Sequence, residues 1–321
     1  MHLIWHYGDG IMKISKLAVG IAAVLLLAAT APAFGQMSGP VKENPAILIV
    51  VFGTSYPEAQ AAFVNVQEMY EEDFPDAEIR IAFTSDFIRN KIKERDGKEI
   101  ESPLTALADL NDEGYQDVVV QSLHVITGHE FHDLANVVQC FDELGESYAF
   151  ENLVLGMPLL ATVEDYKAAS EALETQFDQT TTGVERTATD SPRDPEVTAV
   201  VLMGHGTEHP ANSCYSQMAN ILEEDYENVF LGTVEGYPAF EDVLAKVKAS
   251  GVSKVRLMPF MIVAGDHATN DMAGEDADSW KSMFEEEGFE TEVYLKGMGE
   301  NDDIAEIYVE HTREVLESFE S

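Results

Sequence analysis

Two histidines and one glutamate in the second half of the 321-residue sequence have side chains that bind metal ions. His205 lies between two glycines, Glu235 precedes a Gly-Tyr-Pro tripeptide, and His267 follows an Ala-Gly-Asp tripeptide. Two imidazoles and one carboxylate suit divalent cobalt, iron, nickel or zinc. Three protein ligands also leave coordination positions open, as a site that exchanges its metal requires. We therefore predict a metal site at His205, Glu235 and His267, in which His205 and Glu235 also act in catalysis.

Each of these three residues follows an apolar run that is typical of a buried strand. If the strands are parallel, their carboxyl ends lie along one edge of a sheet, and the three side chains can converge there. Taken singly, Glu235 equally suits a charge at a helix start, and His267 equally suits a helix cap. The shared edge is what favours a common metal site.

A second group of histidines lies in the first half of the sequence. His124 directly follows an apolar run, and we predict that it contacts the substrate. His129 and His132 are three residues apart and can share one helical face. They have two interpretations: a polar helix start, or a role in substrate contact, proton transfer or the binding of a second metal. His209 is close to His205 in sequence but can point away from it.

Short apolar runs, rich in β-branched residues, alternate with helical patterns along the chain. They predict strands at 46–52, 78–83, 117–123, 152–156, 198–203, 228–233, 254–260 and 290–295. Helices are predicted at about 58–72, 103–111, 163–177 and 303–319. Continuous apolar strands that alternate with helices indicate parallel sheets with right-handed crossovers.

The second half of the sequence repeats the pattern of the first. A Gly-Thr-x-x-Pro segment follows the first strand of each half, beginning at Gly53 and at Gly206. The exits of the second and third strands also match in the same order, which predicts an α/β fold of two similar Rossmann-like domains with an interdomain cleft. The predicted parts are an N-terminal domain, a Thr/Asp/Pro-rich linker, a metal-binding domain and a terminal helix that can pack back on the N-terminal domain. Their ranges are 37–178, 179–196, 197–300 and 301–321.

The first 36 residues have the layout of an export signal. A short basic stretch precedes an apolar run from Leu17 to Ala31, and a small-x-small site follows. The apolar run is short for a bilayer span, so we predict a removed signal peptide at 1–36 and a periplasmic protein. An uncleaved N-terminal anchor is the alternative.

The charge and the cysteine content exclude several classes of protein. The formal net charge is −40, which argues against nucleic acid as a partner, because phosphate binding needs basic patches. The sequence has no Walker loop, no GxGxxG after a strand and no GxSxG elbow. Cys140 and Cys214 are not in a CxxC pair, and the sequence leaves open whether they form a disulfide.

Three segments resemble the anaerobic-type sirohydrochlorin cobaltochelatases, the CbiK-type members of the class II chelatases. They are Met203–Thr207, Gly232–Pro238 and Met258–Asp271, and the resemblance extends over nearly all of the sequence from Ile47 onward. It implies two similar chelatase-like α/β domains with a tetrapyrrole between them, no need for ATP, and metal binding by His205, Glu235 and His267. It also implies cobalt as the usual metal, with iron accepted by relatives.

The expected function is therefore the insertion of Co²⁺ into sirohydrochlorin, a step of cobalamin or related tetrapyrrole biosynthesis. The partners would be sirohydrochlorin and a divalent metal ion, and the protein would form a homo-oligomer. Exported relatives that bind haem leave haem binding open, and the sequence assigns no haem ligand. The alternatives are a sirohydrochlorin ferrochelatase and a periplasmic carrier of metal or haem without turnover. Competition between cobalt and iron would separate the cobaltochelatase from the ferrochelatase.

Two sets of residues are candidates for contact with the macrocycle. The apolar set that could hold its face is Phe260, Met261, Ile262 and Val263. The basic set that could pair with its carboxylates is Arg89, Lys91 and Lys93, for which a solvated helix face is the favoured alternative.

Overall fold

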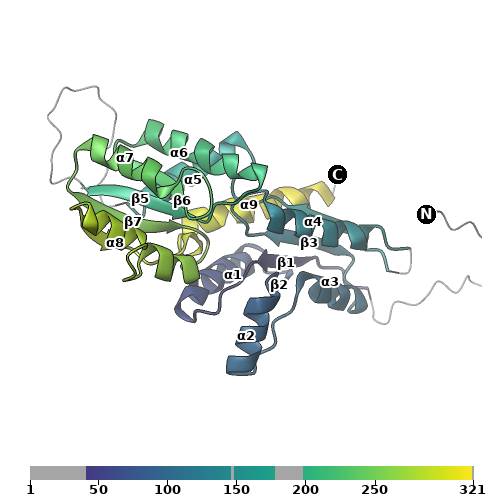
Figure 1. Ribbon diagram of the computed structural model, residues 1–321. Coiled ribbons are helices and arrows are strands. Elements are labelled where there is room, and N and C mark those ends of the chain that lie inside the picture. The colour runs from purple at the N-terminus through teal and green to yellow at the C-terminus, as the bar shows by residue number, and fades with distance from the viewer. Residues whose placement is uncertain (1–40, 146–147, 178–197, 320–321) are drawn as a thin grey trace, which may run out of the picture. The chain divides into compact units, whose positions relative to one another are not determined.

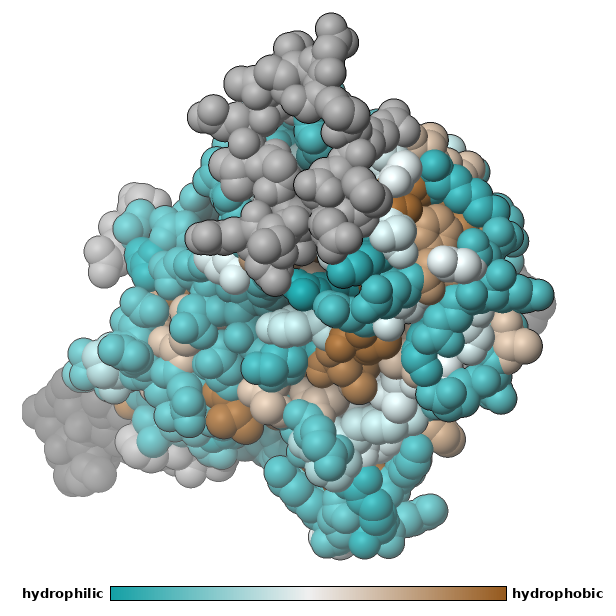
Figure 2. All heavy atoms as spheres, turned by 90° about the vertical axis from the view of Figure 1, so that its left-hand side faces the viewer, coloured by the Kyte–Doolittle hydropathy of each residue, from teal (hydrophilic) through white to brown (hydrophobic). Residues whose placement is uncertain are grey.

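The computed structural model describes residues 41–145, 148–177 and 198–319 (Figure 1). The predicted signal peptide at 1–36 and the predicted linker at 179–196 lie outside these residues. Within the described residues, no helix combines the length and the hydropathy that crossing a bilayer demands. Figure 2 shows one face of the molecule, which is mostly hydrophilic with small separate hydrophobic patches, as the net charge of −40 leads one to expect.

The first half forms a four-stranded parallel sheet in the order β2-β1-β3-β4. Its strands are β1 (Ala46–Val51), β2 (Glu78–Phe83), β3 (Asp117–Ser122) and β4 (Asn152–Gly156). Its helices are α1 (Ala61–Asp73), α2 (Asp86–Asp96), α3 (Pro103–Asp112), α4 (His129–Asp142) and α5 (Val163–Glu174), and a short 3-10 turn, η1 (Glu58–Gln60), precedes α1.

The second half forms another parallel sheet in the matching order β6-β5-β7-β8. Its strands are β5 (Thr198–Gly204), β6 (Val229–Thr233), β7 (Lys254–Phe260) and β8 (Glu290–Val293). Its helices are α6 (Ser213–Asp225), α7 (Phe240–Ser250), α8 (Trp280–Glu286) and α9 (Asp302–Phe319). Shorter turns are the 3-10 segments η2 (Pro210–Asn212) and η4 (Met298–Glu300) and the π-helical segment η3 (Ala268–Met272). The predicted fold of two similar α/β units with parallel sheets is confirmed, and the cleft between them stays a prediction.

Strand β1 shows why the apolar runs were continuous. All six of its residues are buried, because helices cover both faces of the sheet. Ile47 and Ile49 point into a cluster with residues of α1, α5 and α9, whereas Leu48 and Val50 point into a cluster with residues of α3 and α4. Both faces of a central strand in such a sheet must therefore be apolar.

The terminal helix α9 packs against α1, α5, β3 and β4 of the first half. The Tyr70 hydroxyl on α1 lies 2.9 Å from the Thr312 hydroxyl on α9, and both side chains are fully buried. Asn301, just before α9, donates a hydrogen bond of 2.9 Å to the Ala172 carbonyl on α5. The apolar cluster on this face continues into α6 and β5 of the second half, so the two halves share one part of the core.

Candidate metal centre

The register of the second sheet brings the three predicted ligands to one edge. Gly204, the last residue of β5, pairs with Thr233 at the end of β6 and with Phe260 at the end of β7. The chain therefore leaves all three strands at the same level. His205 follows at once, whereas Glu235 is two residues beyond the end of its strand.

The loops after β5 and β6 are held together by their backbones. Beyond the sheet, the amide of Val234 donates to the Gly204 carbonyl at 3.0 Å, and the amide of Glu235 donates to the His205 carbonyl at 2.8 Å. Gly206 has a φ of +81°, and a Cβ there would lie 2.8 Å from the backbone nitrogen of Gly236. Only glycine therefore permits both this backbone conformation and this close approach of the two loops.

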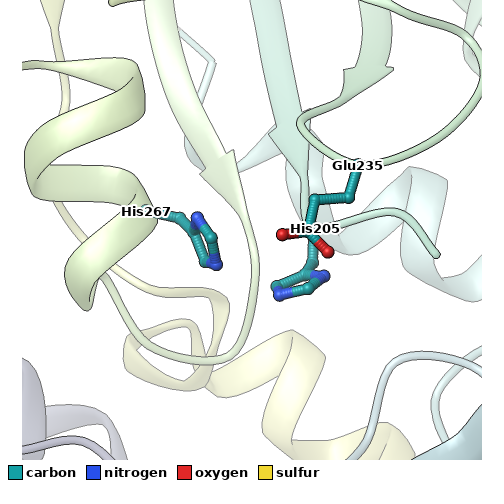
Figure 3. Close-up of side chains that lie close together, drawn as sticks. All are labelled: His205, Glu235 and His267. Carbon is teal, nitrogen blue, oxygen red and sulfur yellow. The ribbon is translucent and has the colours of Figure 1, made fainter.

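The side chains of His205, Glu235 and His267 converge on one point (Figure 3). Each offers one ligand atom, and these atoms all lie within 4.8 Å of one another. The ring centroids of His205 and His267 are 4.5 Å apart, with the ring planes nearly perpendicular. His205 and Glu235 are exposed and His267 is half-buried, so an incoming metal ion can reach the three groups from solvent.

Hydrogen bonds fix which nitrogen of each imidazole is free. The Nδ1 of His205 lies 2.8 Å from the Gly206 carbonyl, which can only accept, so Nδ1 carries the proton. The Nδ1 of His267 lies 2.7 Å from the Asp271 carboxylate and donates in the same way. Metal-binding histidines usually donate their second ring nitrogen to a carbonyl or carboxylate in this manner, because the bond sets the tautomer and the ring orientation. The Nε2 lone pairs of both rings are therefore left for a metal.

A residue of the first half, Tyr56, contacts the loop that carries His267. Its hydroxyl donates a hydrogen bond of 2.7 Å to the Asp266 carboxylate, which also accepts one of 3.1 Å from Asn270. The bond to Asp266 raises the pKa of Tyr56, and burial adds to this effect. Sequence reasoning did not find this residue. The internal repeat pointed to the strand exit at Gly53, but nothing in the sequence showed that Tyr56 would reach the other half.

His124 lies at the exit of β3 as predicted, but its ring is largely buried. Its Nδ1 is 2.7 Å from the Ser122 hydroxyl, and its Nε2 is buried without a hydrogen-bond partner. Burial lowers the pKa of His124 to about 4. The imidazole is therefore neutral at neutral pH and cannot serve as a cation for a substrate carboxylate.

The structure corrects part of the predicted apolar substrate segment. Phe260 is fully buried in the core beside Tyr215, and Ile262 is nearly so. Their side chains pack in the shared core cluster and have almost no surface for a ligand. Met261 and Val263 are only half-buried, and they alone in this segment have a side chain with appreciable exposed surface.

The predicted basic residues all lie on α2. Arg89 forms an ion pair with Asp86, and Lys93 forms one with Glu99 at 2.7 Å. The ammonium group of Lys91 instead lies 5.9 Å from the ring centroids of both Tyr56 and Phe87. Lys91 is thus the member of this set that lies beside a residue contacting the metal-centre loop.

The remaining histidines and cysteines are placed as follows. His129 begins α4 and His132 lies three residues later, and both rings lie near the ring of His209. His209 caps η2 by accepting a hydrogen bond from the Ala211 amide. Cys140 and Cys214 are both free thiols.

Known proteins match this chain over most of its length. Residues 45–317 match the family described as cobalt chelatase (CbiK). The chain is 37% identical over 272 residues to the sirohydrochlorin cobaltochelatase of Salmonella typhimurium, a match that covers 84% of this chain and 96% of that protein. It is 34% identical over 265 residues to the sirohydrochlorin cobaltochelatase CbiKC of Nitratidesulfovibrio vulgaris, with 83% and 88% covered.

Solved structures share the fold at much lower identity. SirB from Bacillus subtilis with Fe³⁺ superposes with a TM-score of 0.53 at 16% identity, covering 85% of this chain and 95% of that one. The sirohydrochlorin chelatase SirB of Bacillus subtilis subspecies spizizenii, in complex with cobalt, also gives 0.53, at 14% identity and with 85% and 96% covered. The sequence matches establish more than the fold: the chain belongs to the cobalt chelatase (CbiK) family.

Proposed function

We propose that this protein inserts Co²⁺ into sirohydrochlorin without ATP. The observation that carries the proposal is the convergence of His205, Glu235 and His267 within 4.8 Å at the exposed edge of the second sheet. The names of the relatives from Salmonella typhimurium and Nitratidesulfovibrio vulgaris support the substrate and the metal. The cobalt ion is a substrate here, because it leaves the protein with the product.

The proposed reaction is an exchange of one metal ion for two protons. The ring nitrogens of sirohydrochlorin lose two protons as the divalent ion enters, so the charge of the ring centre is conserved. His205 and His267 hold the ion through their Nε2 lone pairs. Glu235 either ligates the ion beside them or accepts a pyrrole proton as the ion moves to the ring. Because the three groups leave coordination positions open, the ring nitrogens can replace them one by one.

Exposed aromatic side chains follow one strand in each half, and they support binding of a flat macrocycle. Tyr237 follows Glu235 by two residues and is 60% exposed, and Phe52 follows β1 and is 49% exposed. Ligand sites are lined mostly by apolar and aromatic side chains, with a few polar groups that fix the orientation of the ligand. We propose that these rings, together with Met261 and Val263, contact the macrocycle.

Iron insertion is the second candidate, because the donor set does not separate the two metals by affinity alone. Two SirB structures from Bacillus subtilis, one with Fe³⁺ and one with cobalt, illustrate that one chelatase fold can accept both. Supplying Co²⁺ and Fe²⁺ together in one assay and measuring the ratio of products decides between them. A product that is mostly the iron complex would overturn the cobalt assignment.

The decisive experiment mixes the purified protein with sirohydrochlorin and Co²⁺ and follows the absorbance change of the macrocycle. We expect many equivalents of cobalt-sirohydrochlorin per protein, without ATP. At most one equivalent would instead indicate a carrier of metal. The variant Glu235→Gln should lose most of the rate, whereas Glu241→Gln, at the exposed first turn of α7, should keep it.

We also propose that the protein acts in the periplasm as a homo-oligomer. The layout of residues 1–36 and the family resemblance support these two points. N-terminal sequencing of the protein from a periplasmic fraction tests export, and light scattering tests the oligomer. A protein that keeps its first 36 residues in the cytoplasm, or that is a monomer, would contradict them. Haem is not part of this proposal, and the absorbance spectrum of the isolated protein shows whether it is bound.

A further inference from the structure

Three histidines outside the metal centre lie side by side, although they come from different parts of the chain. His129 and His132 lie on the first turn of α4 in the first half, and His209 lies in the turn before η2 in the second half. The ring centroid of His209 is 4.6 Å from that of His129 and 5.2 Å from that of His132. The proposed function uses none of them.

We propose that His129, His132 and His209 form a second site for a divalent transition-metal ion, such as Co²⁺, Ni²⁺ or Zn²⁺. Three imidazoles are an established donor set for such ions. A ring that binds at about 2.1 Å has its centre about 3.2 Å from the ion, so two tetrahedral ligands have centroids roughly 5 Å apart. The two observed separations lie on either side of this value.

His132 is already in the form that binds a metal. Its Nδ1 lies 2.8 Å from the Gly128 carbonyl and must donate, which leaves the Nε2 lone pair free. This is the arrangement that His205 has in the first metal centre, where Nδ1 donates to the carbonyl of Gly206. A carbonyl behind the ring is the usual support of a metal-binding imidazole.

His209 needs one change before it can bind. Its Nδ1 accepts a hydrogen bond of 3.1 Å from the Ala211 amide, so the neutral ring carries its proton on Nε2. Ligation through either nitrogen therefore breaks or replaces this bond. Burial lowers the pKa of His209, and the neighbouring His129 and His132 lower it further. A depressed pKa favours the neutral ring, which is the form that ligates.

The site would close by side-chain rotation. Among the described residues, only His205, Glu235 and His267 form a group of three whose ligand atoms already lie within 4.8 Å. His129 is exposed, so its ring can turn toward His209 without disturbing the core, while His132 keeps its bond to the Gly128 carbonyl. The net charge of −40 also raises the concentration of divalent cations near the surface.

A metal at this site would link the two halves of the chain. Two ligands belong to α4 and the third follows β5, so the ion would join the first half to the loop that also carries His205. Metal binding here should therefore raise the unfolding temperature even when the first metal centre is removed.

Equilibrium dialysis of the purified protein against Co²⁺, with the visible spectrum of the bound ion as a second readout, tests the proposal. We expect two equivalents for the unmodified protein and one for His205→Ala. The double variant His132→Asn/His209→Asn should keep one equivalent, and combining all three changes should leave none. His311→Asn, which removes an imidazole from α9, is the matched control and should keep two.

The outcomes separate this proposal from the proposed function. If His132→Asn/His209→Asn binds as much Co²⁺ as the unmodified protein, the second site does not exist, and the chelatase proposal stands. If His205→Ala keeps both equivalents, the first centre is wrongly placed, and the second site is judged from its own variants. Circular dichroism spectra checked for each variant ensure that a loss of binding does not come from unfolding.

Discussion

The two halves share a strand order but differ at the ends of their strands. When the Gly-Thr segments are aligned, Phe52 in the first half corresponds to His205 in the second. Both precede a glycine in the left-handed region, with φ of +103° at Gly53 and +81° at Gly206. The backbone is therefore similar, whereas one side chain is an exposed aromatic ring and the other a candidate metal ligand.

The other two positions carry carboxylates in the first half. Asp86 corresponds to Glu235 but begins α2, where it forms an ion pair with Arg89. Glu130 corresponds to His267, and its carboxylate accepts a hydrogen bond of 3.0 Å from Thr84. The first half thus has the same frame but lacks both imidazoles, and its two carboxylates are already bound to neighbouring residues. The comparison teaches that the fold supplies positions, and that the side chains at those positions decide the chemistry.

The largest effect should come from giving the second half the residue of the first. His205→Phe removes one of two imidazole ligands and should lower the chelation rate by roughly 100-fold or more. Even the loss of a residue that only hydrogen-bonds to a ligand costs about 10- to 100-fold. The control is the aligned position in the first half. Phe52→Ala should change the rate by less than about tenfold, since it removes only apolar contact. The rate of cobalt-sirohydrochlorin formation measures both. Equal losses in the two variants would contradict the division of roles.

The next effect concerns Asp271, the hydrogen-bond partner of His267. Glu130, the aligned residue of the first half, instead accepts a hydrogen bond from Thr84. Asp271→Asn weakens the hydrogen bond that orients the imidazole, and it should reduce Co²⁺ affinity by roughly 10- to 100-fold. Asp276→Asn, at an exposed position a few residues later, is the matched control. Metal titration in the absence of sirohydrochlorin gives the affinities directly. A Co²⁺ affinity unchanged by Asp271→Asn would show that the Asp271 carboxylate does not support the metal site.

A third effect concerns stability, at the exits of β3 and β7. His124 aligns with Met261, and burial lowers the pKa of His124 to about 4. The folded state therefore resists protonation more than the unfolded state does. The contribution of neutral His124 to the free energy of unfolding is complete above the ordinary histidine pKa of about 6.5. It is lost as the pH falls toward 4.

The size of this loss follows from the pKa difference and is roughly 2 to 3 kcal/mol. His124→Met, which introduces the residue of the second half, should remove that part of the pH dependence. Urea unfolding at pH 7 and at pH 4.5 measures it. If the difference in unfolding free energy between the two pH values is the same in both proteins, His124 is not the titrating group.

The smallest effect should come from the contact between the halves. Tyr56→Phe removes the hydrogen bond to Asp266, and because the contact is partly exposed we expect a loss of about three- to tenfold in kcat/KM. Tyr148→Phe, at an exposed tyrosine, is the control and should have no effect. Steady-state assays at varied Co²⁺ concentration show whether the loss lies in KM or in kcat. A Tyr56→Phe variant as active as the control would mean that the bond does not position the loop.

The strands were predictable because both faces of these sheets are covered. Apolar runs predicted β2, β4 and β7 with their observed bounds, since most positions of such a strand must be apolar. Strand β8 ends at Val293, two residues before the predicted end, and Leu295 is 45% exposed. An apolar residue just past a strand cannot be distinguished from one within it by pattern alone.

The convergence of the three predicted ligands was predictable, because strand exits in a parallel sheet share an edge. The burial of Phe260 and Ile262 was missed, because whether a residue at or beyond the end of a strand points into the core depends on the packing of distant segments. The same limit applies to Tyr56 beside Asp266 and to His209 beside His129. These contacts join the first half to the second, and a single sequence does not encode their distances in any local pattern.

The close approach at Gly206 has a consequence for how metal preference can change. The spacing between His205 and Glu235 is set by hydrogen bonds from backbone to backbone and by a glycine too small to separate them. Replacing the glutamate by another ligand leaves that spacing intact, because the contacts that hold the two loops come from the backbone and from the Asn212 side chain, not from the Glu235 side chain. Substitutions at 205, 235 and 267 can therefore change the metal preference while the backbone stays as it is. A single methyl group added at Gly206 would instead disturb the spacing of His205 and Glu235, whichever ligands are present.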